Sequence, residues 1–134
     1  MSSKPAELIR SLYGDWSQGD FASSADAFHP NVLFKAAIDE RPVQGRAAMA
    51  ESIRDIISTA SEWTLHLEEL IEEGEHVVVR EHQHAVGRGS GLPLETTLYV
   101  AFKVRDGQVV EALWFENSNE ALAAAGMPEA VGSL

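Results

Sequence analysis

Apolar side chains recur at helical spacing in two stretches of the first half of the chain. Residues 5–18 and residues 46–60 each place them on one side of a helix, with polar side chains on the other side. The first stripe consists of Leu8, Ile9, Leu12, Tyr13 and Trp16, and the second consists of Met49, Ile53, Ile56 and Ile57. Between them, the sequence predicts a short helix from Asp20 to Pro30 and a strand over residues 32–38.

The second half of the chain alternates between apolar and polar positions, which is the pattern of strands. We expect four strands, at residues 63–71, 77–86, 94–104 and 109–117, with a tight Asp-Gly turn before the last. A short helix over residues 119–126 follows. Helices followed by a meander predict an α+β fold, in which N-terminal helices cover a cone-shaped, curved antiparallel sheet that encloses an apolar cavity.

The last two strands provide the expected lining of this cavity. On the strand 94–104, one row is apolar and the other is largely polar, so the apolar row faces the interior. On the strand 109–117, both rows are apolar, and we assign the odd-numbered row to the cavity. The predicted cavity residues on the two strands are therefore Leu98, Val100, Leu113 and Phe115.

The outer face of the sheet then carries aromatic side chains. Trp114 lies opposite the predicted cavity row, and Tyr99 lies opposite the apolar row of the preceding strand. Exposed aromatic area of this kind is typical of an interface between subunits, which predicts a homodimer through the outer face.

Length, composition and charge narrow the range of functions. The 134 residues are the size of one domain, which we take to span residues 1–134. The sequence has no apolar run long enough to span a membrane, and the stretch MSSKPAELIR lacks the apolar core of a signal peptide, so we expect a cytoplasmic protein without a membrane partner. The net charge of −11 argues against binding to nucleic acid, because phosphate contacts require clustered Lys and Arg.

The stretch VVVREHQHAV, residues 77–86, contains two of the five histidines. On a strand, His82 and His84 point to the same side, together with Arg80. They could face water, a metal ion or the inside of a pocket. A metal site needs further ligands, and the residues that follow contain no carboxylate until Glu95. We therefore expect no metal ion at this pair.

Six phrases of the sequence, taken in order, resemble the SnoaL-like branch of the nuclear transport factor 2-like superfamily. They are YGDWSQGDF, FHPNVLF, VQGRAAM, GEHVVVRE, FKVRDGQVVEALWFEN and EALAAAGM. The resemblance covers nearly the whole chain and implies a cone of helices around a curved sheet, a deep apolar cavity and, usually, a homodimer. It implies no single activity, because the superfamily includes isomerases, cyclases, epoxide hydrolases, dehydratases and binding modules.

The catalytic residues of two well-known branches are not retained. At the positions of the two Asp and the Tyr of ketosteroid isomerases, this sequence has Ala36, Val100 and Leu12. At the positions of the Arg and two Asp of limonene epoxide hydrolases, and of their Tyr and Asn, it has His82, His84, Asn117, Phe34 and Ala36. The resemblance therefore implies that the two imidazoles face the cavity.

A neutral imidazole can accept a proton near neutral pH and return it elsewhere. We therefore predict a cofactor-independent isomerase, dehydratase or cyclase that acts on a small, largely apolar carbonyl or enol compound. The predicted catalytic residues are His82, His84 and Asn117. The predicted substrate-binding residues are Trp16, Phe34, Leu98, Val100, Leu113 and Phe115. The alternative is a binding module that uses the same cavity but performs no chemistry.

Overall fold

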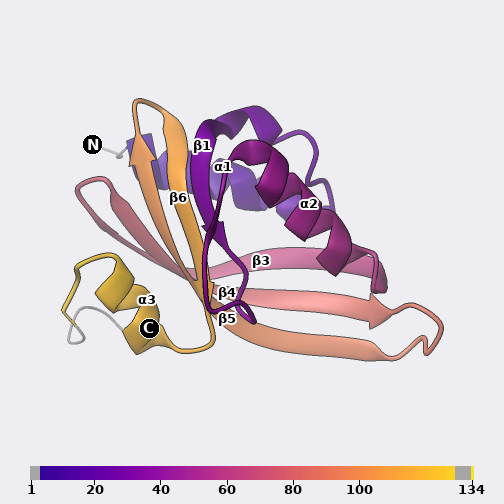
Figure 1. Ribbon diagram of the computed structural model, residues 1–134. Helices are drawn as coiled ribbons and strands as arrows, with labels where there is room; N and C mark the ends of the chain where they lie inside the picture. The colour runs from indigo at the N-terminus through magenta and orange to yellow at the C-terminus, as the bar shows by residue number, and fades with distance from the viewer. Residues whose placement is uncertain (1–3, 129–133) are drawn as a thin grey trace.

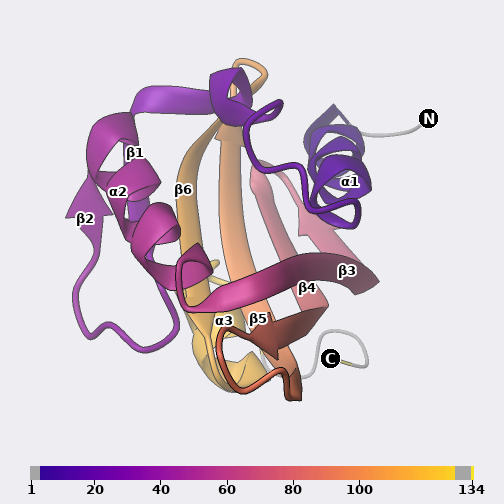
Figure 2. The same ribbon diagram turned by 90° about the vertical axis from the view of Figure 1, so that its right-hand side faces the viewer.

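The computed structural model describes residues 4–128 and 134. In chain order, the elements are α1 (Lys4–Trp16), a short 3₁₀ helix η1 (Ala25–Ala27), β1 (Phe28–Lys35), β2 (Val43–Gln44), α2 (Arg46–Ile57), β3 (Ala60–Glu73), β4 (His76–Gly87), β5 (Pro93–Arg105), β6 (Gln108–Phe115) and α3 (Ser118–Ala124). Figure 1 and Figure 2 show a strongly curved sheet that is flanked by α1, α2 and α3. The predicted α+β class is confirmed.

The six strands form one sheet in the order β2-β1-β6-β5-β4-β3. Neighbouring strands run antiparallel, except that β1 and β6 run parallel. Irregularities in register within the β3–β4 and β5–β6 pairs bend the sheet. One of them, between Leu67 and Glu69, shifts the buried row of β3 by one residue, so that Leu67 and Leu70 pack on the same side.

The segment between α1 and β1 differs from the sequence-based expectation. The helix expected from Asp20 to Pro30 is reduced to η1, and β1 already begins at Phe28. Pro30 therefore lies inside a strand. The strand tolerates it because the pairing of β1 with β6 is interrupted between Phe28 and Leu33, where a backbone N–H is not needed for the ladder.

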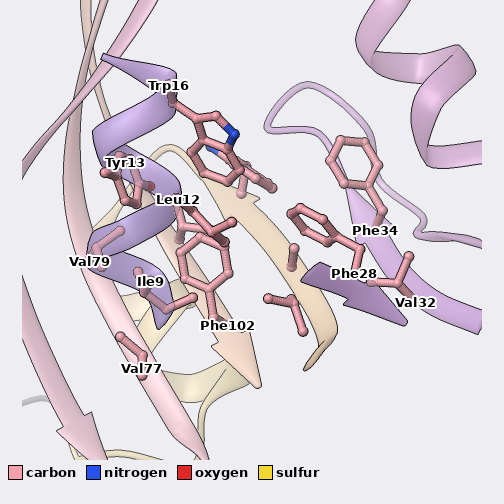
Figure 3. Packing of buried hydrophobic residues seen from close by; sticks show 14 of the residues in the cluster. Ile9, Leu12, Tyr13, Trp16, Phe28, Val32, Phe34, Val77, Val79 and Phe102 are labelled. Atoms are coloured by element: carbon pink, nitrogen blue, oxygen red, sulfur yellow. The ribbon is translucent and has the colours of Figure 1, made fainter. Parts of the chain in front are cut away.

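The main core lies between α1 and the inner face of the sheet. Helix α1 buries four apolar side chains against it, and Figure 3 shows Leu12 and Trp16 on the side of Phe102, with Phe28 and Phe34 projecting from β1. The Tyr13 and Trp16 rings are 4.9 Å apart between centroids, and Phe102 and Trp114 are 5.8 Å apart. Edge-to-face contacts of this kind add to the stabilisation from apolar burial.

A second, smaller core covers part of the outer face of the sheet. Ala121 and Leu122 of α3 pack on Val78 and Ala101, and Tyr99 and Phe115 lie at the edge of this cluster. The aromatic area that the sequence analysis assigned to a partner subunit is thus partly covered by the chain's own C-terminal helix. The homodimer stays a prediction, but it no longer follows from Tyr99.

Candidate functional site

A large cavity lies between α2 and the inner face of the sheet. Its volume is about 1200 Å³, it is partly open, and aromatic and aliphatic side chains form most of its wall. The apolar residues of the wall include Trp16, Phe28, Phe34, Met49, Ile53, Leu65, Leu98 and Trp114. The size and the predominantly apolar lining are those of a site for a small organic molecule.

The cavity exists because α2 packs less tightly on the sheet than α1 does. Helix α1 buries four side chains, whereas Met49 alone is buried among the described side chains of α2. Ile53 and Ile56 are only half-buried, although they belong to the apolar stripe of α2, and both lie on the cavity wall. The apolar stripe that predicted this helix therefore contributes both to the core and to the cavity wall.

A fully buried carboxylate lies behind the cavity wall. Glu81 of β4 is 0% exposed, and its two oxygens accept hydrogen bonds from three side chains. Tyr13 Oη donates to Oε1 at 2.6 Å, Gln83 Nε2 donates to Oε2 at 2.6 Å, and Trp114 Nε1 donates to both oxygens at 3.2 and 3.0 Å. Because Gln83 and Trp114 also line the cavity, they connect the buried carboxylate to it.

Burial controls the charge of this group. Desolvation raises the pKa of Glu81 above its usual value, although the hydrogen bonds from Tyr13, Gln83 and Trp114 act in the opposite direction. The pKa of Tyr13 is raised well above its usual value, first by burial and then by the nearby charge of Glu81. Tyr13 therefore stays protonated near neutral pH and acts as a donor to the carboxylate.

Trp16, Phe34 and Leu98 lie on the cavity wall, where the sequence analysis placed them. Val100 faces the same side of the sheet, but it is 0% exposed and belongs to the core next to the cavity. Whether any of these residues binds a ligand stays a prediction.

The structure corrects the placement of Leu113 and Phe115. Phe115 packs with the cluster under α3, and Leu113 pairs with Ala101 of the same outer cluster. Trp114, which was expected on the outer face, lies in the cavity wall instead. The physical reason is an irregularity between Lys103 and Val104, which shifts the β5–β6 register by one residue and so exchanges the two faces of β6.

His82 and His84 do not line the cavity, so the expectation that they face it is wrong. Their neighbours Glu81 and Gln83 point inward, and the imidazoles lie on the other face, with about a third of each side chain exposed (35% and 33%). His84 Nδ1 donates to Glu95 Oε1 at 2.7 Å, and His82 Nε2 contacts the other oxygen of Glu95. The hydrogen bond with Glu95 is the main reason that the pKa of His84 is raised.

The remaining polar candidates have structural roles in this arrangement. Asn117 caps α3, because its Oδ1 accepts a hydrogen bond from the backbone N–H of Glu120 at 2.9 Å. Arg80 lies on the outer face with the imidazoles and pairs with Glu68 at 3.3 Å. Among residues 4–128 and 134, no three His, Cys, Asp or Glu side chains group closely enough to hold a metal ion.

The sequence analysis missed Glu81, although one signal pointed to it. The inner row of β5 was assigned correctly, and Leu98 of that row pairs directly with Glu81 across the β4–β5 ladder. Directly paired residues lie on the same face of a sheet. A hairpin register drawn from the connection at residues 88–92 would therefore have turned Glu81 and Gln83 inward.

Within the described part of the chain, no helix is long and apolar enough to cross a membrane. A model of the SnoaL-like domain matches residues 9–112. No curated protein matches the chain.

Solved structures share the fold. A provisionally assigned SnoaL-like polyketide cyclase from Jannaschia sp. CCS1 is 18% identical, with a TM-score of 0.74 over 93% of each chain. TerC, co-crystallised with polyporic acid, is 19% identical, with a TM-score of 0.73 over 92% of this chain and 98% of its own. SalBIII, an epoxide hydrolase/cyclase-like enzyme in pyran ring formation in the polyether salinomycin, is 16% identical, with a TM-score of 0.74 over 87% of this chain and 92% of its own.

Proposed function

The chain belongs to the SnoaL-like domain family, and we propose that it binds a largely apolar small molecule in the cavity under α2. Membership of the family supports a cyclase-type or a small-molecule-binding role. The observation that carries the proposal is the cavity itself, with about 1200 Å³ of space and a wall in which Trp16, Phe34 and Trp114 present aromatic surface. Burial of an apolar ligand against such a wall supplies most of the binding free energy.

Binding is the function that the geometry supports best, because both carboxyl oxygens of Glu81 already accept hydrogen bonds from side chains of the protein. Both of its oxygens accept hydrogen bonds from Tyr13, Gln83 or Trp114, and none of its surface is exposed. In this arrangement the carboxylate holds two wall residues in place and touches no ligand.

Filling the cavity tests the proposal. Ala50 of α2 lines the cavity, and the next residue, Glu51, is exposed. We expect Ala50→Trp to weaken binding of the neutral fluorophore N-phenyl-1-naphthylamine at least tenfold, whereas Glu51→Trp, the matched control on the same helix, leaves it unchanged. Fluorescence titration measures both affinities, and circular dichroism checks that both variants fold. Equal binding by wild type and Ala50→Trp would place the ligand elsewhere.

A second candidate is a cofactor-independent isomerase, dehydratase or cyclase that acts by proton transfer. The buried Glu81, whose pKa is raised by desolvation, favours it, because such groups beside a cavity are candidates for general base catalysis. Displacement of the Gln83 amide by a substrate would open one lone pair of Oε2, which would keep only its hydrogen bond from Trp114 Nε1. The oxygen could then take a proton from a carbon next to a carbonyl group, while the C–H electron pair moves toward the carbonyl oxygen, and return the proton to another atom.

Deuterium exchange separates the two candidates. Carbonyl and enol compounds that bind are incubated in D₂O with the protein, and NMR follows the loss of their exchangeable C–H signals. If Glu81 is the base, Glu81→Gln lowers the exchange rate by about a hundredfold or more. His82→Ala and His84→Ala test the sequence-based hypothesis in the same assay. Binding without exchange in the wild-type protein supports the binding module.

A further inference from the structure

Gln83 is a polar residue in the middle of an otherwise largely apolar part of the wall. Its direct neighbours across the ladders are Leu65 of β3 and Thr96 of β5, and all three line the cavity. On the same face of the sheet, Leu98 pairs with Glu81, so Gln83 is the next residue along this face of β4 after the buried Glu81. A polar group at this position is available to orient a ligand.

Glu81 determines which end of the Gln83 amide is available. Glu81 Oε2 accepts a hydrogen bond from the amide nitrogen, Gln83 Nε2, at 2.6 Å, so the nitrogen end of the amide is engaged. The carbonyl oxygen of the planar amide then points away from Glu81. In residues 4–128 and 134, no donor bonds to this Oε1. Every buried side-chain oxygen or nitrogen of these residues has a hydrogen-bond partner, so Oε1, which has none, is not buried. Oε1 is therefore an open acceptor on the cavity wall.

We propose that Gln83 Oε1 accepts a hydrogen bond from a hydroxyl group of the ligand, so that the cavity selects hydroxylated apolar molecules such as phenols, enols and alcohols. This inference rests on the proposed binding function and adds the chemical class of the ligand. Glu81 acts as a positioning residue, because it fixes the amide from behind.

Several polar groups of the wall form hydrogen bonds within the protein. Ser24 Oγ accepts a hydrogen bond from Trp16 Nε1 at 3.0 Å and donates to the carbonyl oxygen of Phe21 at 3.4 Å. The guanidinium group of Arg46 donates to the backbone oxygen of Phe28. Thr96, the cross-strand neighbour of Gln83, is a rival acceptor, and so are the exposed carboxylates of Asp55 and Glu116 on the same wall, so the experiment must exclude all three.

A matched pair of ligands tests the inference without any variant. 2-Naphthol carries a hydroxyl group, and 2-methoxynaphthalene has the same ring system without a donor. We expect calorimetry at neutral pH to show that the wild-type protein binds 2-naphthol about three- to tenfold more tightly, the range expected for one net hydrogen bond. Equal affinities, or tighter binding of the ether, would overturn the inference.

Variants identify the acceptor. Gln83→Met keeps the length of the side chain but removes Oε1, so the ratio of the two affinities should fall to about one. Glu81→Gln releases the amide from its fixed orientation, so the ratio of the two affinities should fall toward one. Thr96→Val should keep the ratio. If Gln83→Met keeps the wild-type ratio, or Thr96→Val abolishes it, Gln83 is not the selecting residue.

The outcome for the proposed function is separate. If N-phenyl-1-naphthylamine binds in the cavity but the two naphthalenes bind equally well, the inference about Gln83 fails and the binding function stands. If none of the three compounds binds, both fail. Thermal unfolding of each variant, followed by circular dichroism, shows whether a lost ratio reflects lost folding, and the wild-type ratio remains decisive in that case.

Discussion

The two faces of β4 carry similar polar side chains in very different surroundings. On the inner face, Glu81 is 0% exposed and accepts hydrogen bonds only from protein side chains. On the outer face, His82 and His84 share Glu95, whose side chain is 53% exposed. The inner cluster has lost its hydration and depends on its partners, whereas water can replace any partner in the outer cluster. Burial therefore decides which cluster is costly to disturb, although both contain a glutamate.

The largest expected effect compares these two glutamates. Glu81→Ala leaves Tyr13 Oη and Trp114 Nε1 buried without an acceptor and opens a small void, so we expect the free energy of unfolding to fall by about 2–4 kcal/mol. Glu95→Ala should change it far less, because water solvates both imidazoles. Urea denaturation of both variants measures the difference. Similar losses in the two variants would mean that burial does not distinguish the two clusters.

The hydroxyl group of Tyr13 provides a narrower test of the inner cluster. Tyr13→Phe keeps the ring contacts with Trp16 and Phe102 but removes the donor to Glu81 Oε1. We expect a loss of about 1–3 kcal/mol, the usual range when a buried group loses a hydrogen-bond partner. Tyr99→Phe on the outer face is the matched control, and we expect little change. A larger loss from Tyr99→Phe would contradict the comparison.

The inner and outer faces of the sheet could be assigned from the sequence for some strands but not for others. On β5, apolar Leu98, Val100 and Phe102 alternate with Thr97 and Lys103, and the assignment of the inner face was correct. A strand with one polar row fixes its own orientation, because the opposite orientation would bury a charged side chain and expose large apolar ones.

Strands β4 and β6 lacked this asymmetry. From Arg80 to His84, β4 is polar on both faces, and the later part of β6 is apolar on both. In such strands the orientation depends on pairing. A regular ladder from the Asp106-Gly107 turn would have placed Leu113 opposite Val100, but the irregularity near Lys103 places Trp114 there instead. The irregularity inserts one extra residue into β6, and the alternation of apolar and polar positions does not reveal such an insertion.

The cavity itself could be predicted only in outline. The apolar stripe of α2 and the curved sheet were visible as patterns, but the distance between them depends on how the side chains of η1, β1 and the loop after it pack. Glu81 was hidden for a different reason. A charged residue in a strand is ordinarily exposed, and two of its three donors, Tyr13 and Trp114, lie 68 and 33 residues away in the sequence.

The pH dependence of stability provides a further comparison, because the contribution of Glu81 and that of the outer cluster should change differently with pH. Burial raises the pKa of Glu81 in the folded protein above its value of about 4.3 in the unfolded chain. The folded state then binds the proton more tightly, so this contribution to stability is complete below the unfolded pKa and is lost as the pH rises through the folded pKa. We expect the free energy of unfolding of wild type, minus that of Glu81→Gln, to fall as the pH rises from about 4. Urea denaturation at several pH values measures it, and a difference that rises would contradict burial as the dominant cause.

The smallest expected effect belongs to the outer cluster, where the pKa of the histidine and the pKa of the glutamate shift in opposite directions. The hydrogen bond with Glu95 raises the pKa of His84, so its contribution is complete below about 6.5 and is lost as the pH rises through the folded pKa. The imidazoles lower the pKa of Glu95, so its contribution is complete above about 4.3 and is lost as the pH falls through the folded pKa. The stability of wild type relative to Glu95→Gln should therefore peak between about pH 4.3 and 6.5 and shrink in high salt, because the groups are exposed. Thermal unfolding across this pH range, with and without added salt, measures the peak. A difference that ignores salt, or that falls steadily with pH as expected for Glu81, would mean that the outer cluster is not a solvated ion pair.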